Sequence, residues 1–391
     1  MQVAIIGAGL GGLCLAQGLA RAGIEFVIVE SDASAQIRGQ GYRLRIDQDG
    51  QQALADCLKP EAYRLFRASS ARSGMGRFLN PALQEFEERR PENWHQATEV
   101  EPETGDCSAN RQTMREILLH GVEEHIHWGK KVREFTQDAN GISLYCADGE
   151  HIRADIAVAA DGAYSALRAQ YLPQARPEDI GAINIYGKTL LAPEICAQLT
   201  PELLEGVTVI FADGFTLVME PMQFRAPMAT LAAQYAPTCR LSDVENYMYW
   251  AFFGLPASLG GPIKRVSDAD LMLRDRITCA TRDFHPQIRH LLMHSDPNTL
   301  CARPVSMVPY VPQWKTTRLT LLGDAIHAMS PAGGLGANTA LADAASLSRF
   351  LAQNPKNFLH ALTCYEQDMR SWAEHALALT RAGTERLLRR H

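Results

Sequence analysis

The sequence predicts an α/β fold made of a parallel α/β part, a mostly antiparallel β-sheet part and C-terminal helices. Three observations support this prediction. The β-branched run at residues 3–6 leads through a glycine-rich turn into a helical pattern, as in a βαβ unit. Short alternating runs separated by prolines and glycines recur from residue 180 to about 310, which is typical of an antiparallel sheet. A second strand, glycine-rich loop and alanine-rich helix follow at 318–347.

Composition and charge narrow the class of protein. The chain of 391 residues is long enough for two or three domains, and its net charge of −6 argues against nucleic acid as a partner. Nine scattered cysteines without a CxxC pair argue against disulfides and zinc and favour a cytoplasmic location. His120, His125 and His127 lack a metal-ligand spacing, so we predict no metal site. We find no signal peptide and no apolar run near the roughly 18 residues of a membrane span, so we expect no stable membrane insertion.

The first element is a strand that runs into the segment GAGLGG at residues 7–12. In this pattern Gly7 makes a tight turn, Gly9 lets a pyrophosphate approach the backbone, and Gly12 lets helix and strand pack closely. The helix runs to about residue 22, and a second strand at 26–29 ends at Glu30, which we expect to hold ribose hydroxyls. This Rossmann-like unit accepts FAD or NAD, whereas the Glu30 carboxylate disfavours the 2′-phosphate of NADP at this site.

A basic strand is predicted next. The alternation at 42–46 places Arg43 and Arg45 on one face, where they can serve phosphate, an anionic substrate or a flavin edge, or simply face solvent. Asp49-Gly50 is expected to close this strand before a helix at 51–58. Residues 70–108 are irregular and charged, so we expect surface hairpins and loops that cover part of a substrate cavity or only connect elements.

A capped helix is expected after this irregular region, with Ser108 or Asn110 as the cap. Arg111 and Arg115 lie four residues apart on one face of it, where Arg111 can reach a phosphate or flavin, although a surface pair is the alternative. Strands at 132–135, 142–146 and from 152 follow with tight turns, and the apolar strand at 156–160 is expected in the middle of a parallel sheet. It leads into the segment DGAYSALR, which begins at Asp161.

The second part of the chain is expected to form one mostly antiparallel sheet. Its strands are predicted at 183–186, 207–211, 215–219, 228–232 and 247–253, with helices within 268–294 and a return segment at 303–310. Aromatic residues in these strands can line a pocket, although packing in the core is the simpler interpretation. We therefore divide the chain into residues 1–175 (first part of the nucleotide-binding domain), 176–300 (substrate domain), 301–355 (second part of the nucleotide-binding domain) and 356–391 (C-terminal helices).

The segment at 323–347 is unusually rich in glycine. Asp324 ends a strand, where a carboxylate can accept hydrogen bonds from sugar or polyol hydroxyls. Pro331 directs the following loop, and the glycines up to Gly336 let the backbone lie against a flat ligand. A helix is expected from Asn338, and its first N–H groups favour negative charge nearby. Further helices are predicted at 350–369 and 373–388.

Three motifs in this order, GAGLGG with Glu30, DGAYSALR and GDAIHAMSPAGGLGANTALADAASL, resemble the class A FAD-dependent aromatic-hydroxylase family, which includes p-hydroxybenzoate hydroxylase. The GYRLRI stretch and the length look nearer to the secondary-metabolite and tetracycline-inactivating members. The resemblance implies a Rossmann-like FAD-binding domain, with Arg168 in a motif linked to FAD binding and NAD(P)H use. The implied cofactor-binding residues are Gly7, Gly9, Leu10, Gly12, Glu30, Arg43, Arg111, Asp161, Asp324, Pro331, Gly334, Gly336 and Ala337.

The resemblance also implies a reaction. FAD is reduced by NADPH or NADH, without a second Rossmann domain, and reacts with dioxygen to give a C4a-hydroperoxide that transfers one oxygen atom to an aromatic or polyketide-like small molecule. No catalytic residue can be chosen from the sequence, and the expected assembly is a monomer or a homodimer. The alternatives are an FAD-dependent reductase or halogenase on a related fold, or a flavin-holding protein that only binds a ligand. A halogenase WxWxIP signature is absent, and a plain NAD-dependent dehydrogenase leaves the segment at 323–347 unexplained.

Overall fold

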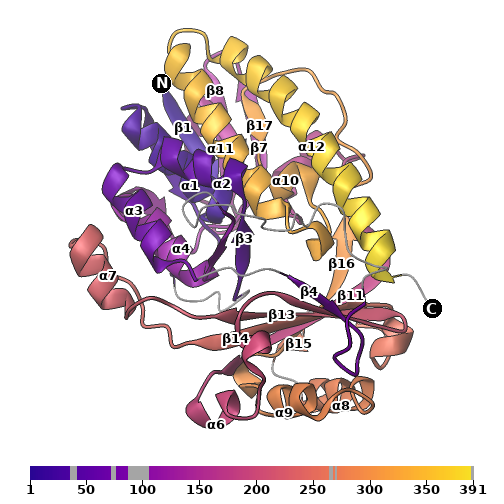
Figure 1. The fold of residues 1–391 in the computed structure, drawn as a ribbon. Helices are drawn as coiled ribbons and strands as arrows, with labels where there is room; N and C mark the ends of the chain where they lie inside the picture. Colours follow the sequence, from indigo (N-terminus) through magenta and orange to yellow (C-terminus); the bar gives the residue numbers. More distant parts are fainter. Residues whose placement is uncertain (36–41, 72–75, 87–104, 264–266, 269–270, 389–391) are drawn as a thin grey trace.

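The computed structural model describes residues 1–35, 42–71, 76–86, 105–263, 267–268 and 271–388. It has two main layers (Figure 1): a parallel α/β part, and below it a large sheet whose far face is covered by short helices. The long last helix runs from the α/β part down to this sheet. The predicted α/β class with a Rossmann-like part and a mostly antiparallel sheet is confirmed.

The α/β part is built on a five-stranded parallel sheet with the order β17-β10-β1-β2-β6. Its strands are β1 (Gln2–Ile6), β2 (Glu25–Val29), β6 (Ile126–His127), β10 (Ile156–Ala159) and β17 (Leu319–Leu321). Every residue of β10 and β17 is buried, as expected for apolar strands covered on both faces. Because parallel strands end at the same edge of a sheet, the loops after β1, β10 and β17 meet there.

Small residues let the helices pack closely on this sheet. The main helices are α1 (Leu10–Arg21), α2 (Gln48–Cys57), α3 (Pro60–Ser69), α4 (Arg111–Leu119), α11 (Gly336–Gln353) and α12 (Phe358–Leu388). A Cβ atom on Gly18 of α1 would lie 2.5 Å from Oγ of Ser348 in α11, and one on Gly11 would lie 2.6 Å from the side chain of Leu322. A larger residue at either position would push α1 away from its neighbours.

The large sheet has seven strands in the order β15-β16-β11-β14-β13-β12-β4. They are β4 (Arg77–Leu79), β11 (Glu178–Leu190), β12 (Thr208–Ala212), β13 (Phe215–Met222), β14 (Tyr247–Gly254), β15 (Ser267–Asp268) and β16 (Cys301–Met307). Only β4 pairs in parallel with its neighbour; the other pairs are antiparallel. One face of the sheet packs into a hydrophobic core around the fully buried Trp250, and the other faces the α/β part.

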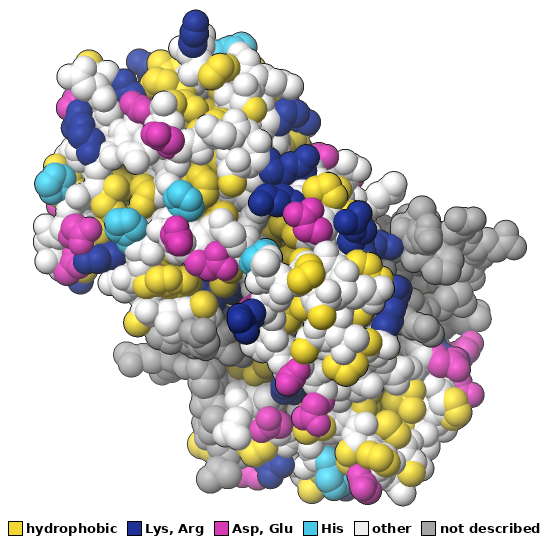
Figure 2. Space-filling model, turned by 90° about the vertical axis from the view of Figure 1, so that its left-hand side faces the viewer, with side chains coloured by type: hydrophobic (Ala, Val, Ile, Leu, Met, Phe, Trp, Pro, Cys, Tyr) yellow, Lys and Arg dark blue, Asp and Glu magenta, His cyan; other side chains and the backbone are white. Residues whose placement is uncertain are grey.

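Smaller elements complete the fold. A three-stranded meander consists of β7 (Val132–Asp138), β8 (Gly141–Cys146) and β9 (His151–Ala154), and a two-stranded ribbon of β3 (Leu44–Ile46) and β5 (Cys107–Ala109). The shorter helices are α5 (Ala166–Tyr171), α6 (Pro193–Cys196), α7 (Met228–Tyr235), α8 (Leu271–Ala280), α9 (Pro286–Met293) and α10 (Asp324–His327). No helix in the described ranges is long and apolar enough to span a bilayer. Figure 2 shows basic, acidic and hydrophobic side chains interspersed over one face of the molecule.

Several element predictions were wrong. The strand predicted at 228–232 is helix α7, in which Met228, Leu231 and Ala232 are buried at helical spacing. Asp49-Gly50 does not close β3, because α2 already begins at Gln48. Most residues of the helices predicted at 350–369 and 373–388 are helical, but the boundaries were wrong: 350–353 end α11, and 358–388 form one continuous helix, α12, with no break at 370–372. The helix predicted from Asn338 begins two residues earlier.

Other predictions about the loops have mixed outcomes. Of the two candidate caps of α4, Asn110 is the one that accepts a hydrogen bond from the N–H of Thr113, at 3.0 Å. The irregular region at 70–108 contributes β4 to the large sheet and β5 to the small ribbon. Residues 87–104 and the glycines before Tyr42 lie outside the described residues.

Candidate functional site

The glycine-rich loop after β1 is tightly packed except at one point. Gly7 has φ +109°, and a Cβ atom on it would lie 2.5 Å from the carbonyl oxygen of Ala160. A Cβ on Gly12 would lie 2.1 Å from the carbonyl oxygen of Gly7, whereas one on Gly9 would meet nothing within 4 Å. The loop is therefore open only at Gly9, where α1 begins without a side-chain cap. An open, uncapped helix N-terminus is suited to an anionic group.

Two buried charged side chains hold this loop in place by hydrogen bonds to its backbone. The carboxylate of Glu30, which is only 2% exposed, accepts hydrogen bonds from the N–H groups of Ala8 (2.6 Å) and Asp32 (2.8 Å). The buried guanidinium of Arg115 donates to the carbonyl oxygen of Ala8 at 3.3 Å. Glu30 therefore braces the loop, and its predicted contact with a ribose stays a prediction.

Two other predicted residues, Arg111 and Asp324, are brought near each other from elements far apart in the sequence. Asp324 begins α10 after Gly323, which adopts φ +64°. Its side chain is open to solvent on one side, yet protein surrounds it closely enough that desolvation raises the pKa of its carboxyl group, while His327 and Arg111 lower it. A Cβ atom on Gly336 would lie 3.8 Å from Oδ1 of Asp324. The first turns of α4, α10 and α11 thus converge on one place.

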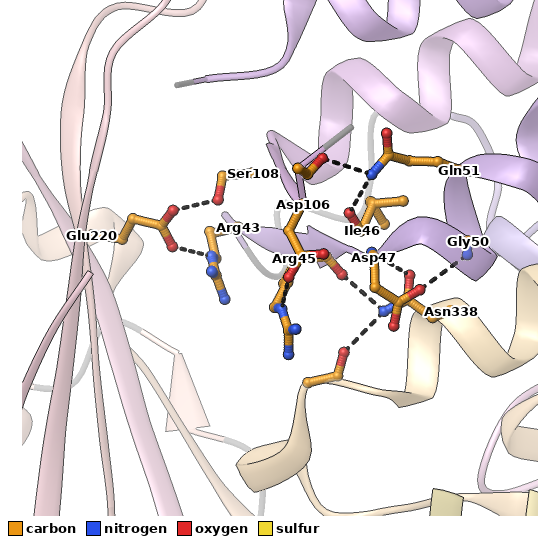
Figure 3. A network of polar contacts seen from close by, with 12 residues as sticks. Arg43, Arg45, Ile46, Asp47, Gly50, Gln51, Asp106, Ser108, Glu220 and Asn338 are labelled. Carbon is orange, nitrogen blue, oxygen red and sulfur yellow. Dashed lines mark hydrogen bonds and ion pairs between the residues drawn. The ribbon is translucent and has the colours of Figure 1, made fainter. Parts of the chain in front are cut away.

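The loop between α10 and α11 is tied to strand β3 by Asn338, a residue for which no site role was predicted from the sequence. Its Nδ2 donates to the carbonyl oxygens of Arg45 and Gly334, each at 3.1 Å, and its Oδ1 accepts from the N–H of Asp47 at 3.2 Å (Figure 3). A Cβ on Gly50 would lie 2.2 Å from this Oδ1, so Gly50 leaves the space for Asn338. In the sequence, only the position of an asparagine in the first turn of a predicted helix indicated this role of Asn338.

The loop itself has the conformation that its glycines and proline permit. Pro331 begins a short 3-10 turn, and Gly334 ends it with φ +63°. The residues from 331 to 337 are exposed or half-buried, including Pro331, Gly336 and Ala337. Helix α12 packs against the turn, since a Cβ atom on Gly333 would lie 2.9 Å from Oγ1 of Thr380 in α12.

A buried histidine–aspartate pair anchors the same region from the inside. Asp343 of α11 accepts hydrogen bonds from Nε2 of His327 (2.7 Å), the N–H of Gly323 (2.8 Å) and Nε1 of Trp372 (2.8 Å). Both members of the pair are fully buried. Burial lowers the pKa of His327, but the charge and hydrogen bond of Asp343, together with the charge of Asp324, raise it above its usual value. No site role was predicted for these two residues from the sequence.

The DGAYSALR segment links two loops at the edge of the parallel sheet. Nη1 of Arg168 donates to the carbonyl oxygens of Ala163 (2.8 Å) and Ala325 (3.1 Å). Asp161 accepts from the N–H of Ala166 at 3.2 Å, and desolvation raises the pKa of its carboxyl group despite hydrogen bonds that lower it. These contacts are internal to the protein, so the predicted contact of Asp161 with a cofactor stays a prediction.

Arg43 connects the α/β part with the large sheet. It forms an ion pair with Glu220 of β13, which is fully buried and also accepts a hydrogen bond from Ser108 (Figure 3). Arg45 forms an ion pair with Asp106, with Nε and Oδ2 2.6 Å apart. The two arginines predicted to share one basic face therefore both have carboxylate partners, and the predicted cofactor contact of Arg43 stays a prediction.

A cavity of about 680 Å³ extends from the glycine-rich loop to the large sheet. On the loop side it is lined by Ala8, Gly9, Leu10, Arg111 and Arg115, and on the sheet side by Tyr42, Tyr186, Lys188, Leu190 and Arg303. Its size is in the range of small-molecule sites. Among the described residues, no group of three or more His, Cys, Asp and Glu side chains could hold a metal ion.

Comparison with known proteins agrees with this geometry. A family model described as an FAD binding domain matches residues 1–200 and 304–380. A crystal structure from Photorhabdus luminescens subsp. laumondii TTO1, of a protein provisionally described as an FAD-containing monooxygenase, is similar with TM-score 0.83 and 30% identity over 99% of this chain and 98% of that one. Klebsiella pneumoniae HpxO, solved with FAD and uric acid, is similar in fold with TM-score 0.76 and 20% identity over 98% and 88% of the two chains.

A curated relative is the dual O-methyltransferase/FAD-dependent monooxygenase of Cercospora beticola, which is 31% identical over 98% of this chain and 46% of its own length. The chain spans about half the length of the first curated relatives it matches. The family match covers both segments that contribute to the glycine-rich loops, 1–200 and 304–380, and leaves out most of the large sheet. The chain belongs to the family of FAD-binding domains that this model describes.

Proposed function

We propose that this chain is an FAD-dependent monooxygenase that uses NADPH or NADH and dioxygen to insert one oxygen atom into an aromatic or polyketide-like small molecule. The observation that carries the proposal is one path of solvent-accessible groups. It begins at the open Gly9, passes Arg111 and Asp324, and continues to the half-buried loop before α11. The cavity beside Gly9 and Arg111 leaves room for a substrate against the large sheet.

The residues present fit FAD in one orientation. The N–H groups at Gly9 and Leu10, with Arg111, would hold the pyrophosphate, and Glu30 would face the adenosine ribose. Asp324 would accept hydrogen bonds from the ribityl chain. The flavin ring would lie beside the loop that contains Pro331, Gly334, Gly336 and Ala337, where the N-terminus of α11 stabilises negative charge. When bound and reduced, FAD supplies the activation of dioxygen.

In this proposal each part of the chain has a main task. Residues 1–175 and 301–355 bind FAD, 176–300 form most of the substrate wall, to which Tyr42 and Arg303 also contribute, and 356–391 brace the loop before α11. The sheet-side wall of the cavity positions the substrate and keeps water from the ring. We propose that the enzyme is cytoplasmic, in accordance with its nine free cysteines. We also propose that it is a monomer or a homodimer.

A glycine substitution tests the FAD site separately from the fold. A Cβ atom on Gly9 meets nothing within 4 Å, so Gly9→Val should fold normally but lose FAD. Gly12→Ala is the matched comparison, because its Cβ would lie 2.1 Å from a backbone oxygen and should also lower thermal stability without FAD. Flavin content by absorbance and FAD affinity by fluorescence quenching are the measurements. A Gly9→Val protein with the wild-type FAD affinity would contradict the site.

A second experiment tests the activity. Consumption of NADPH and NADH is followed with a panel of phenols, naphthols and aromatic acids, and products are examined by mass spectrometry for one added oxygen atom from ¹⁸O₂. Oxygenated product supports the monooxygenase. Reduced or halogenated product would favour the reductase or the halogenase, and tight ligand binding without turnover would favour a flavin-holding binding protein.

A further inference from the structure

One face of the large sheet presents a lysine to the cavity. Strand β11 alternates, so that Tyr186, Lys188 and Leu190 face the cavity while Gly187 and Thr189 face the core around Trp250. Lys188 lies opposite Tyr249 of β14 in the register of the sheet. Its position on a regular strand in the middle of the sheet fixes where its side chain starts.

Aromatic rings flank the ammonium group of Lys188. Its Nζ lies 5.5 Å from the centre of the Tyr42 ring and 5.4 Å from that of the Tyr247 ring. These rings are themselves held in place, because the hydroxyl of Tyr247 donates to the carbonyl oxygen of Tyr42 at 2.5 Å and accepts from Nδ2 of Asn110 at 2.9 Å. The cation is therefore held between two fixed aromatic surfaces.

The charge of Lys188 is not balanced by a carboxylate of the described chain within 4 Å. Glu220, the buried acid on the same sheet, is engaged by Arg43 and Ser108. Asp243 and Glu245 also line the cavity, but both are exposed. Arg303 adds a second positive charge to the sheet side. A half-buried ammonium in such a wall is stabilised when a ligand brings an anionic oxygen to it.

We propose that Lys188 determines substrate specificity by binding an anionic oxygen carried on an aromatic ring, as in an aromatic carboxylate or an ionised phenol. The rings of Tyr42 and Tyr186, which line the cavity, suit a planar ring beside that oxygen. This inference rests on the proposed function, since it names the substrate class of the same cavity. Lys188 acts here by binding and orienting the substrate.

Equilibrium dialysis of the FAD-loaded protein with a matched pair of probes tests this inference. The probes are 1-hydroxy-2-naphthoate and 1-hydroxy-2-naphthamide, which differ mainly in charge. We expect the wild-type protein to bind the acid at least about tenfold more tightly than the amide, a difference worth about 1.4 kcal/mol. Lys188→Gln should abolish this preference, and Lys188→Arg should keep most of it. The exposed Lys356→Gln is the control for loss of one positive charge, and it should bind like wild type.

Four outcomes would overturn the proposal. They are no preference in the wild type, no binding of the acid at millimolar concentration, an unchanged preference in Lys188→Gln, and a preference that is lost in Arg303→Gln but kept in Lys188→Gln. A pH series of 2-naphthol binding separates the two sources of the anion, because a phenolate subsite should strengthen binding as the phenol ionises. The dialysis does not depend on turnover. A protein that discriminates between the probes but forms no oxygenated product would therefore refute the proposed function and leave the anion subsite standing.

Discussion

The buried acid Asp343 should be one of the most sensitive positions outside the cavity. Asp343→Asn keeps the shape of the side chain but replaces one carboxylate oxygen with an amide NH₂. In the native protein the two oxygens accept three hydrogen bonds, from His327, Gly323 and Trp372. An asparagine in either orientation turns its NH₂ toward a buried N–H group, because donors lie on both sides of the carboxylate.

The expected magnitude follows from these contacts. Leaving a buried donor without a partner costs about 1–3 kcal/mol. Removing one charge of a buried ion pair costs about 3–5 kcal/mol. Because the variant keeps part of the hydrogen bonding, we expect a loss of about 3 kcal/mol in the free energy of unfolding, where these ranges meet. FAD should also bind more weakly, since the N–H of Gly323 orients the first turn that carries Asp324.

The loss should depend on pH in a direction set by His327, whose pKa is raised in the folded protein. A group with a raised folded pKa contributes stability that is fully present below its unfolded pKa of about 6.5, and this contribution disappears as pH rises through the folded pKa. The contribution of His327 to the stability of the wild-type protein should therefore decrease as the pH rises above about 6.5. Asp343→Asn removes the main cause of the raised pKa, so the difference between the two proteins should be larger near pH 6 than at alkaline pH above the folded pKa of His327.

Urea denaturation of both proteins at a fixed excess of FAD, repeated across this pH range, provides the measurement. Asp368→Asn is the matched control, because this acid is partly exposed and its Oδ2 lies 3.9 Å from Nη2 of Arg349. Exposed pairs contribute only about 0–1 kcal/mol, so the control should behave like wild type. Equal stability of Asp343→Asn and wild type, or a difference that does not change with pH, would refute the reasoning.

Three further changes probe the site and its supports. Asp324→Ala should weaken FAD binding by about 1–3 kcal/mol through loss of a hydrogen-bond acceptor, measured by fluorescence titration; an unchanged affinity would remove Asp324 from the FAD site. Gly334→Val should impair flavin seating, because φ +63° strains a β-branched residue, and a wild-type flavin spectrum with full turnover would count against the loop's position. Glu220→Gln should lower stability by about 3–5 kcal/mol because it leaves Arg43 with a neutral partner, and an unchanged denaturation midpoint would mean that this buried pair contributes little.

Local sequence patterns predicted much of the fold. The parallel strands β1, β2 and β10 are apolar or β-branched runs bounded by turn residues, so their type could be recognised without knowing their neighbours. The glycines of the first loop were also predictable, since their spacing reflects backbone geometry within one βαβ unit. Helix α7 was misread as a strand because its short apolar run, at residues 228–232, suits either structure.

The sequence by itself determined the α/β class, the glycine-rich loops and most of the residues expected along the cofactor path, because these depend on contacts within short segments. Only the tertiary structure decided which distant side chains meet: His327 with Asp343, Arg43 with Glu220, and Lys188 between two tyrosine rings. No local pattern contains these pairs, because each joins elements whose approach depends on the packing of the whole chain. They set the charge of the cavity wall and the support of the loops, and so they shape what the cavity can bind.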